Sequence, residues 1–182
     1  DSANDAFITI DAEGLVRGWN AKAEKIFGWT KAEAVGGSLT QNIIPERYRA
    51  MHTAGMKKYH RTGENIVLNN RIEISAMHKD GREFPVELAI WPSRRGKDVY
   101  FHAFIHDISE KKSSEENLKQ SARYIQLLQT IAFTANLATT SREALEVCLR
   151  EICGLMNWPI GHVYQLDESG ERLAPTDIWF LR

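Results

Sequence analysis

Histidine and cysteine are the residue types through which this chain could bind a metal ion or carry out nucleophilic chemistry. His102 and His106 lie four residues apart in Asp98–His106, an apolar and aromatic run that is typical of a β-strand. Residues four apart on a strand share a face but are separated by roughly 13 Å, too far to ligate one metal ion. The sequence shows no Ser/His/Asp set, carboxylate pair or phosphate-binding loop. We therefore predict neither a catalytic nor a metal site.

The two cysteines, Cys148 and Cys153, lie five residues apart in a segment with helical spacing. They therefore fall on different faces of the expected helix, and a disulfide framework is not expected. Reduced, buried thiols are typical of proteins in a reducing compartment. On this ground we predict a cytoplasmic location.

Composition excludes several functional classes. The chain has 182 residues, 43% of them hydrophobic and 26% charged, which suits one ordinary folded domain and a smaller second part. The formal net charge is −1, and basic residues come in runs of only two or three, which argues against nucleic-acid binding. No apolar run approaches the roughly 20 residues of a membrane helix, and the sequence does not open on a signal-peptide pattern.

The first sixty residues alternate between short strands and short helices. Two apolar segments, 6–11 and 15–19, flank Glu13-Gly14 and predict a β-hairpin. Asn20 is placed to cap a helix over 21–27 that Gly28 ends. Thr30 and Glu33 have the spacing of a capping box for a helix over 31–35. A loop is expected at 38–44, and helical spacing predicts a helix at 46–61.

Three further strands are expected at 67–77, 83–92 and 98–106, with an Asp-Gly turn at Asp80-Gly81 and a second turn at 93–97. Two strands, several short helices and three antiparallel strands together predict an α+β domain. In this domain all helices cover one face of a five-stranded antiparallel sheet.

The amino-acid sequences of three stretches resemble those of one known family. They are Trp19–Trp29, His78–Glu87 and Phe104–Lys111, the last with Ser109 where the family often has threonine. The chain up to about residue 110 thus resembles a PAS domain, a sensory module of bacterial-type signalling proteins. The resemblance implies a PAS domain at 1–109, a signalling helix at 110–138 and an output domain that the helix controls.

Strand parity and the resemblance together predict which residues line a ligand pocket under the helices. These are Leu88, Ile90, Phe101, Ala103 and Ile105. The alternative is that they form an ordinary core. None of them is charged, so a natural ligand is expected to be small and apolar, or a haem.

The resemblance raises haem as a possible cofactor and leaves its presence open. His52 lies in the helix where PAS domains similar to the rhizobial oxygen sensors carry the proximal haem ligand, which implies an alternative function as a haem-based gas or redox sensor. A structural histidine is the other interpretation. The position of those sensors' oxygen-stabilising arginine falls on Ile72, and Arg71 has the opposite parity. Flavin–thiol photochemistry is not expected, because both cysteines follow residue 138.

The end of the last strand is the predicted point of signal relay. Asp107 and Ser109 stand where a strand ends and a helix begins, and their side chains could accept bonds from the first helical amides. The helix that follows repeats apolar residues at heptad spacing, which predicts a weak coiled-coil seam. The seam consists of Leu118, Ile125, Leu128, Ala132 and Ala135.

The outer face of the sheet predicts a second contact surface. By parity it carries Glu87, Ala89, Trp91, His102, Phe104 and His106. Trp91 and Phe104 would form an exposed apolar patch in a monomer. We therefore predict a homodimer through this face and the linker helix.

The last segment, 139–182, resembles the opening of a GAF domain. Thr140 and Glu143 predict a capping box for a helix with a buried face, and two strands are expected at 161–166 and 173–181. The predicted buried face is Leu145, Cys148, Leu149, Ile152 and Met156. So short a segment is near the lower limit for an independent core, so we expect the chain to stop inside this domain. A catalytic output domain, such as a histidine kinase or a cyclic-dinucleotide enzyme, would then lie beyond residue 182.

Overall fold

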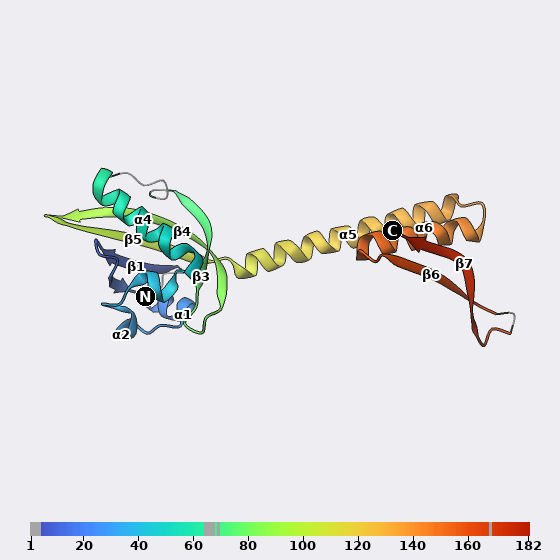
Figure 1. The fold of residues 1–182 in the computed structure, drawn as a ribbon, viewed down its shortest axis with the longest axis horizontal. Helices are drawn as coiled ribbons and strands as arrows, with labels where there is room; N and C mark the ends of the chain where they lie inside the picture. Colours follow the sequence, from blue (N-terminus) through green and yellow to red (C-terminus); the bar gives the residue numbers. More distant parts are fainter. Residues whose placement is uncertain (1–4, 64–67, 69, 168) are drawn as a thin grey trace. The chain divides into compact units, whose positions relative to one another are not determined.

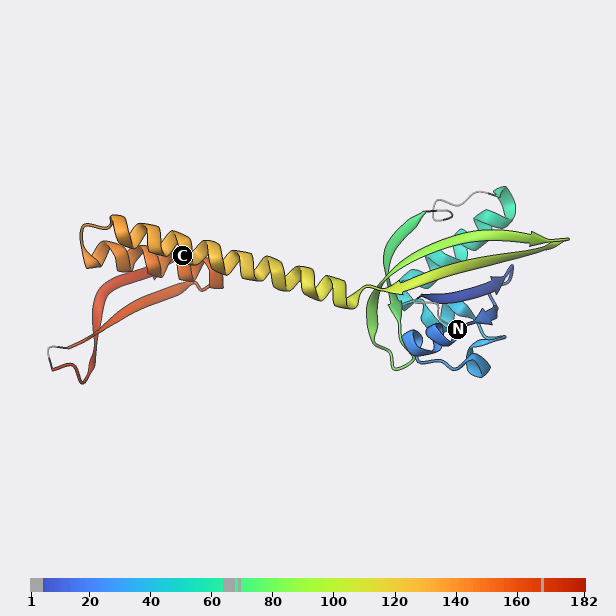
Figure 2. The same ribbon diagram turned by 180° about the vertical axis from the view of Figure 1, so that it is seen from behind.

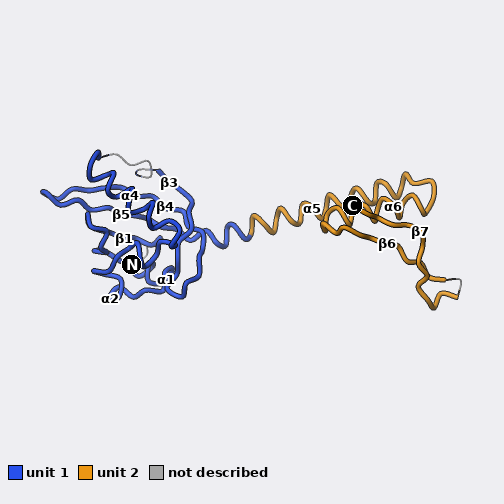
Figure 3. The backbone as a smooth tube through the Cα atoms, viewed as in Figure 1, with its two compact units in different colours: residues 1–113 blue, residues 114–182 orange. Residues whose placement is uncertain are grey.

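The structure is a computed structural model that describes residues 5–63, 68, 70–167 and 169–182. These residues form two compact units, 1–113 and 114–182, which Figure 3 shows in different colours. Within the described residues, no helix has both the length and the apolar composition needed to cross a bilayer.

Unit 1 contains a five-stranded antiparallel sheet in the order β2-β1-β5-β4-β3. Its helices cover one face of this sheet, as the opposite views of Figures 1 and 2 show. The predicted α+β class and five-stranded sheet are confirmed. The strands are β1 Ala6–Asp11, β2 Val16–Trp19, β3 Arg71–Met77, β4 Glu83–Arg95 and β5 Asp98–Asp107.

The helices of unit 1 begin and end largely at the predicted residues. They are α1 Ala21–Phe27, α2 Lys31–Ala34, α3 Leu39–Ile43 and α4 Glu46–Thr62. Asn20 Oδ1 accepts a hydrogen bond from the Ala23 amide at 2.8 Å, and Gly28 ends α1 at φ +76°. The capping box of Thr30 and Glu33 is confirmed.

Three expectations for unit 1 need correction or a limit. A strand over 83–92 and a turn at 93–97 were expected, but β4 continues to Arg95 and pairs with β5 up to Asp98. Residues 38–44 were expected to be a loop, but 39–43 form α3. This helix lacks a side-chain cap, and the buried side chain of Ile43 holds it to the core, a tertiary contact that local signals do not reveal. The third strand was expected from Val67, but the described part of β3 begins at Arg71, and Val67 lies outside the described residues.

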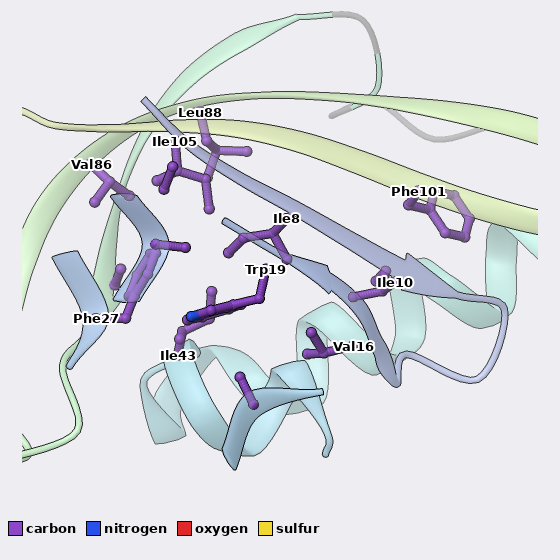
Figure 4. Close-up of a cluster of buried hydrophobic side chains, with 14 of the residues drawn as sticks. Ile8, Ile10, Val16, Trp19, Phe27, Ile43, Val86, Leu88, Phe101 and Ile105 are labelled. Atoms are coloured by element: carbon purple, nitrogen blue, oxygen red, sulfur yellow. The ribbon is translucent and has the colours of Figure 1, made fainter. Parts of the chain in front are cut away.

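The core of unit 1 lies between the sheet and its helices. Ile8, Phe27 and Val86 are among its most deeply buried side chains, and Figure 4 shows them together with Trp19 and Ile105. Phe27 of α1 contacts the rings of Trp19 and Phe84 at centroid distances of 5.5 and 5.7 Å. This aromatic cluster fixes α1 on the sheet.

Unit 2 consists of the later part of α5 Ser109–Leu137, α6 Ser141–Met156 and the hairpin β6 Ile160–Leu166 with β7 Leu173–Leu181. Thr140 Oγ1 accepts a bond from the Glu143 amide at 3.2 Å, as predicted. The Glu143 carboxylate, however, accepts its bond from the amide of Thr139. The expected reciprocal box is therefore displaced by one residue.

The predicted buried face of α6 is partly wrong. Ile152 and Met156 are exposed, and the buried residue is Cys153, which the predicted face did not include. The cause is the close approach of β6 at Gly161: a Cβ atom there would lie 2.4 Å from Cys153 Sγ. A glycine on the strand thus determines which side of the helix is covered.

Candidate functional site

A cavity of about 880 Å³ lies in unit 1 between the inner face of the sheet and helices α3 and α4. All six strand residues expected around a pocket are on its wall, brought together from three strands. They are Ile72, Leu88, Ile90, Phe101, Ala103 and Ile105. The register explains this arrangement, because Leu88 pairs with both Ile72 and Ile105, and Ile90 pairs with Ala103.

Helix α4 supplies the opposite wall of the cavity, which sequence reasoning did not assign apart from His52. Tyr48, Met51 and Met56 line the cavity, and Tyr59, one turn later, packs edge-on against Phe101 at 4.9 Å. Met51 lines the cavity yet is 68% exposed, so α4 covers the sheet loosely there. The three- and four-residue spacing of these side chains was the available signal.

His52 lies on the cavity wall, and its ring is held by one hydrogen bond. His52 Nδ1 and Thr40 Oγ1 of α3 are 3.1 Å apart. Burial lowers the pKa of His52, because it penalises the charged imidazolium. A neutral imidazole with one nitrogen engaged by a neighbour is the form in which histidine ligates metals, so His52 fits the proximal side of a haem site.

The guanidinium of Arg71, the residue next to Ile72, points away from this cavity. Arg71 Nη1 donates to Glu87 Oε1 at 3.0 Å, on the outer side of the sheet. Ile72 takes the inner position. The cavity wall therefore has an aliphatic side chain at the position where the resemblance placed an arginine. Charged residues on the wall, within the described part of the chain, are Lys58, Glu73 and Lys112.

The two strand histidines have partners on the outer face. His102 lies 3.0 Å from Thr9 Oγ1 through Nδ1 and 2.7 Å from Ser93 Oγ through Nε2. His106 Nδ1 lies 2.7 Å from Asp5 Oδ1. Among residues whose positions are described, no three histidine, cysteine or acidic side chains gather in a way that could hold a metal ion.

An aromatic cluster covers part of the outer face. Phe7 of β1, absent from the predicted patch, lies 6.1 Å from Trp91 and 5.1 Å from Phe104 between ring centroids. Trp91 and Phe104 are 5.2 Å apart, and Phe104 is 44% exposed. The sequence alone did not show that Phe7 belongs to this cluster, because that depends on the pairing of Phe7 with Phe104 between β1 and β5.

The start of α5 is anchored to the sheet at the predicted junction. Asp107 Oδ1 accepts a hydrogen bond from the Ser109 amide at 2.9 Å, so the Asp107 side chain satisfies the first amide of α5 and Ser109 contributes its backbone. Between them, Ile108 is buried and its amide donates to the Pro85 carbonyl at 3.1 Å. The strand and the helix therefore meet without a flexible linker.

This arrangement of sheet, helices and exit helix corresponds to a known family. A model of the PAS fold matches residues 1–108. The chain belongs to the PAS family. The sensor protein FixL of Bradyrhizobium diazoefficiens is 25% identical over 152 residues, which cover 84% of this chain and 30% of that protein. The cell-division control histidine kinase PdhS of Brucella ovis is 30% identical over 128 residues, which cover 68% of this chain and 12% of the kinase.

A solved structure agrees on the fold. The crystal structure of a PAS domain from Colwellia psychrerythraea has a TM-score of 0.50 at 22% identity, and covers 60% of this chain and 91% of that domain. The matching parts make up less than a third of FixL and PdhS. The PAS family model ends at residue 108, before the segment with the expected GAF resemblance.

Proposed function

We propose that the chain is the regulatory part of a signal-transduction protein, in which a PAS domain at 1–109 binds a small apolar ligand. The helix at 110–138 then relays the state of the cavity to an output domain. The observation that carries this proposal is the cavity of about 880 Å³, whose strand wall is uncharged at the five positions singled out by parity and at Ile72. Its strands lead directly into the exit helix.

An uncharged fluorescent probe tests the cavity. We expect 1-N-phenylnaphthylamine to bind the wild type and to brighten as it leaves water. Ala103→Trp fills the cavity from β5 and should weaken binding by about tenfold or more. Ala89→Trp is the matched control, because it adds the same side chain on the neighbouring strand with opposite parity. Failure of the wild type to bind, or equal binding by both variants, would contradict the proposal.

Haem is the second candidate ligand, favoured by the neutral, cavity-lining His52 and its bond to Thr40. Haem reconstitution should then produce a Soret band in the wild type and in His60→Ala, which removes an exposed imidazole from the same helix. The band should be lost in His52→Ala. Equal and negligible absorbance in all three proteins would eliminate haem.

The proposed output is a kinase activity outside residues 1–182. The name of PdhS, a histidine kinase, supports this choice over a cyclic-dinucleotide enzyme. Purified 1–182 is expected to show no autophosphorylation with ATP. Incorporation of phosphate into this chain would contradict the assignment.

A homodimer through α5 and the outer face is also proposed. Three seam residues of α5, Leu118, Ile125 and Leu128, are 71%, 55% and 64% exposed, which supports a helical partner for them. The aromatic cluster of Phe7, Trp91 and Phe104 supports a second contact. Sedimentation of wild type, Trp91→Lys/Phe104→Lys and Leu118→Lys/Ile125→Lys separates the two surfaces, and a monomeric wild type would contradict both.

The segment 139–182 is proposed to be the first part of a GAF-like domain. Its support is the order of one helix and two antiparallel strands, with one face of the hairpin against α6. An expression series that extends the chain past residue 182 tests this. A longer chain should protect the exposed face of the hairpin from hydrogen exchange, and no protection in any extension would contradict it.

A further inference from the structure

A side chain in the first turn of α5 contacts β3, one of the two edge strands of the sheet. Lys112 Nζ lies 2.5 Å from Glu73 Oε2 of β3, although α5 continues directly from β5 and β4 separates β5 from β3. Both residues contribute to the cavity wall. The ion pair therefore connects the exit helix to a strand with which the helix has no backbone continuity.

Strand β3 is one of the two edge strands of the sheet, and of these two it is the one that lines the cavity. It is the last strand of the sheet and pairs only with β4. Ile72 and Ile74, on either side of Glu73, line the cavity, and Ile74 is 38% exposed. An edge strand with few buried contacts opens at low free-energy cost. A molecule that fills the cavity against Ile72 and Ile74 would therefore move Glu73.

We propose that the Glu73–Lys112 ion pair couples the cavity to α5, so that displacement of β3 changes how the first turn of α5 is held. This inference rests on the proposed function of the cavity. Asp107 and Ile108 fix α5 to β5 and β4. Lys112 adds the attachment to the strand that borders the cavity. Its hydrogen bond also holds the pKa of Glu73 below its ordinary value, so the carboxylate stays charged.

The ion pair is suited to a switch because it is weak. Its side chains are 46% and 44% exposed, and water screens such pairs. A pair of this kind can break and re-form without unfolding the domain. The coupling should consequently be strong at low ionic strength and largely lost at about 1 M salt.

Charge reversal with hydrogen exchange tests the coupling in the chain 1–182. Lys112→Glu should raise amide exchange in β3, and Glu73→Lys should raise it in the first turn of α5, each by about two- to fivefold. The double variant restores the opposite charges and should return both to wild-type rates. Lys111→Glu is the comparison variant: Lys111 acts on Glu73 through its charge alone, without the hydrogen bond that Lys112 makes, so its reversal should raise β3 exchange less than Lys112→Glu does. Unchanged β3 exchange in Lys112→Glu, or no recovery in the double variant, overturns the proposal.

The same experiment with 1-N-phenylnaphthylamine separates this inference from the proposed function. In the wild type, saturating probe should change exchange at 109–113, and in Lys112→Glu it should bind without that change. A probe effect on α5 that survives Lys112→Glu overturns the ion-pair route. If the wild type fails to bind the probe, the cavity proposal fails, while the exchange rates without probe still decide whether the ion pair couples β3 to α5.

Discussion

The two units differ in how far their apolar strands are covered. In unit 1 the inner face of the sheet is covered by helices, and residues such as Ile8 and Ile105 are 2% and 5% exposed. In unit 2 the hairpin is apolar on both faces, and one of them stays open: Ile160, Trp179 and Leu181 are 58%, 57% and 71% exposed. Their pairing places them together opposite the face that α6 covers.

This difference shows that strand hydrophobicity alone does not determine burial. Ile178, buried at 4%, and Trp179, exposed at 57%, are neighbours on β7. Successive side chains on a strand point to opposite faces, and α6 covers only one of them. In unit 1 the two faces differ in composition as well, because the outer face also carries Glu87 and His106. A covering layer, present on one face in each unit, decides which apolar residues contribute to stability.

The largest expected effect comes from removing matched aromatic rings in the two units. Phe27 is fully buried and Phe133 is 67% exposed. Phe27→Ala should lower the free energy of unfolding of unit 1 by about 3 to 5 kcal/mol through a cavity in the core. Phe133→Ala should change stability by less than about 0.5 kcal/mol. Urea unfolding followed by circular dichroism measures both, and comparable losses would mean that Phe133 is covered by a partner.

The next largest effect is expected at two glycines, Gly161 and Gly28, whose backbone lies close to a side chain of another element. A Cβ at Gly161 would meet Cys153 Sγ at 2.4 Å, and one at Gly28 would meet the His78 ring at 2.4 Å. Gly28 also has φ +76°, a left-handed conformation that costs other residues about 1 to 2 kcal/mol. Each Gly→Ala change should destabilise its own unit by about 1 to 3 kcal/mol through overpacking.

Removing the contacted side chain distinguishes these sites. Cys153→Ala together with Leu149→Ala should relieve much of the cost of Gly161→Ala, because an added Cβ would meet Cys153 Sγ at 2.4 Å and Leu149 Cδ1 at 2.8 Å and the cost is therefore steric. His78→Ala should relieve only part of the cost of Gly28→Ala, since the backbone strain remains. Double-mutant cycles by urea unfolding measure both recoveries. Equal recovery at the two glycines would contradict the role given to φ at Gly28.

Local signals in the sequence predicted much of unit 1 and less of unit 2. Asn20, Gly28 and Thr30 act within a few residues of their own position, so their roles can be read without a structure. The residues around the cavity were predictable by parity, but the space was not, because Leu88 in its wall has the same pattern as the core residue Phe84. Whether α4 fills that space depends on the packing angle between helix and sheet.

The features that the sequence did not predict share a physical cause: each depends on contacts with residues distant in the chain. Helix α3 is held by the burial of Ile43, and it has no side-chain cap from which the sequence could have predicted its start. Burial of Cys153 depends on Gly161, eight residues later. The pair of Glu73 and Lys112 joins residues far apart in the chain and follows no periodic pattern. None of these contacts leaves a signal in local composition or spacing.

The pH dependence of stability should belong to unit 1 and trace to His52. In the unfolded chain a histidine takes up a proton near pH 6.5, whereas burial lowers the pKa of folded His52. The unfolded state then binds more protons, so unit 1 loses stability as pH falls below about 6.5. The hydrogen bond from Lys79 lowers the pKa of Glu33 to about 2. Protonation of that carboxylate therefore affects stability at lower pH than protonation of His52 does.

Urea unfolding between pH 5 and 7.5 measures this contribution. His52→Gln should flatten the pH dependence of the unit 1 transition, while His60→Gln, on the same helix, should leave it in place. Unit 2 lacks His52 and should not share the change. An identical slope in wild type and His52→Gln would mean that the imidazole of His52 is not shielded from water in solution.

The smallest effects are expected at the starts of α5 and α6, where a carboxylate accepts from the first amides of α5 and a hydroxyl accepts from the first amides of α6. Asp107 Oδ1 accepts the Ser109 amide at 2.9 Å, and Thr140 Oγ1 accepts the Glu143 amide at 3.2 Å. Asp107→Ala and Thr140→Ala should each cost about 1 kcal/mol, and the carboxylate also favours the positive end of the helix dipole. Ser109→Ala should cost little, because Ser109 donates through its backbone. Hydrogen exchange at 109–113 and 141–145 locates each loss. If α5 frays as much in Ser109→Ala as in Asp107→Ala, the Ser109 hydroxyl also contributes to the start of α5. Both helices would then begin with a hydroxyl contact, and the carboxylate would not distinguish α5 from α6.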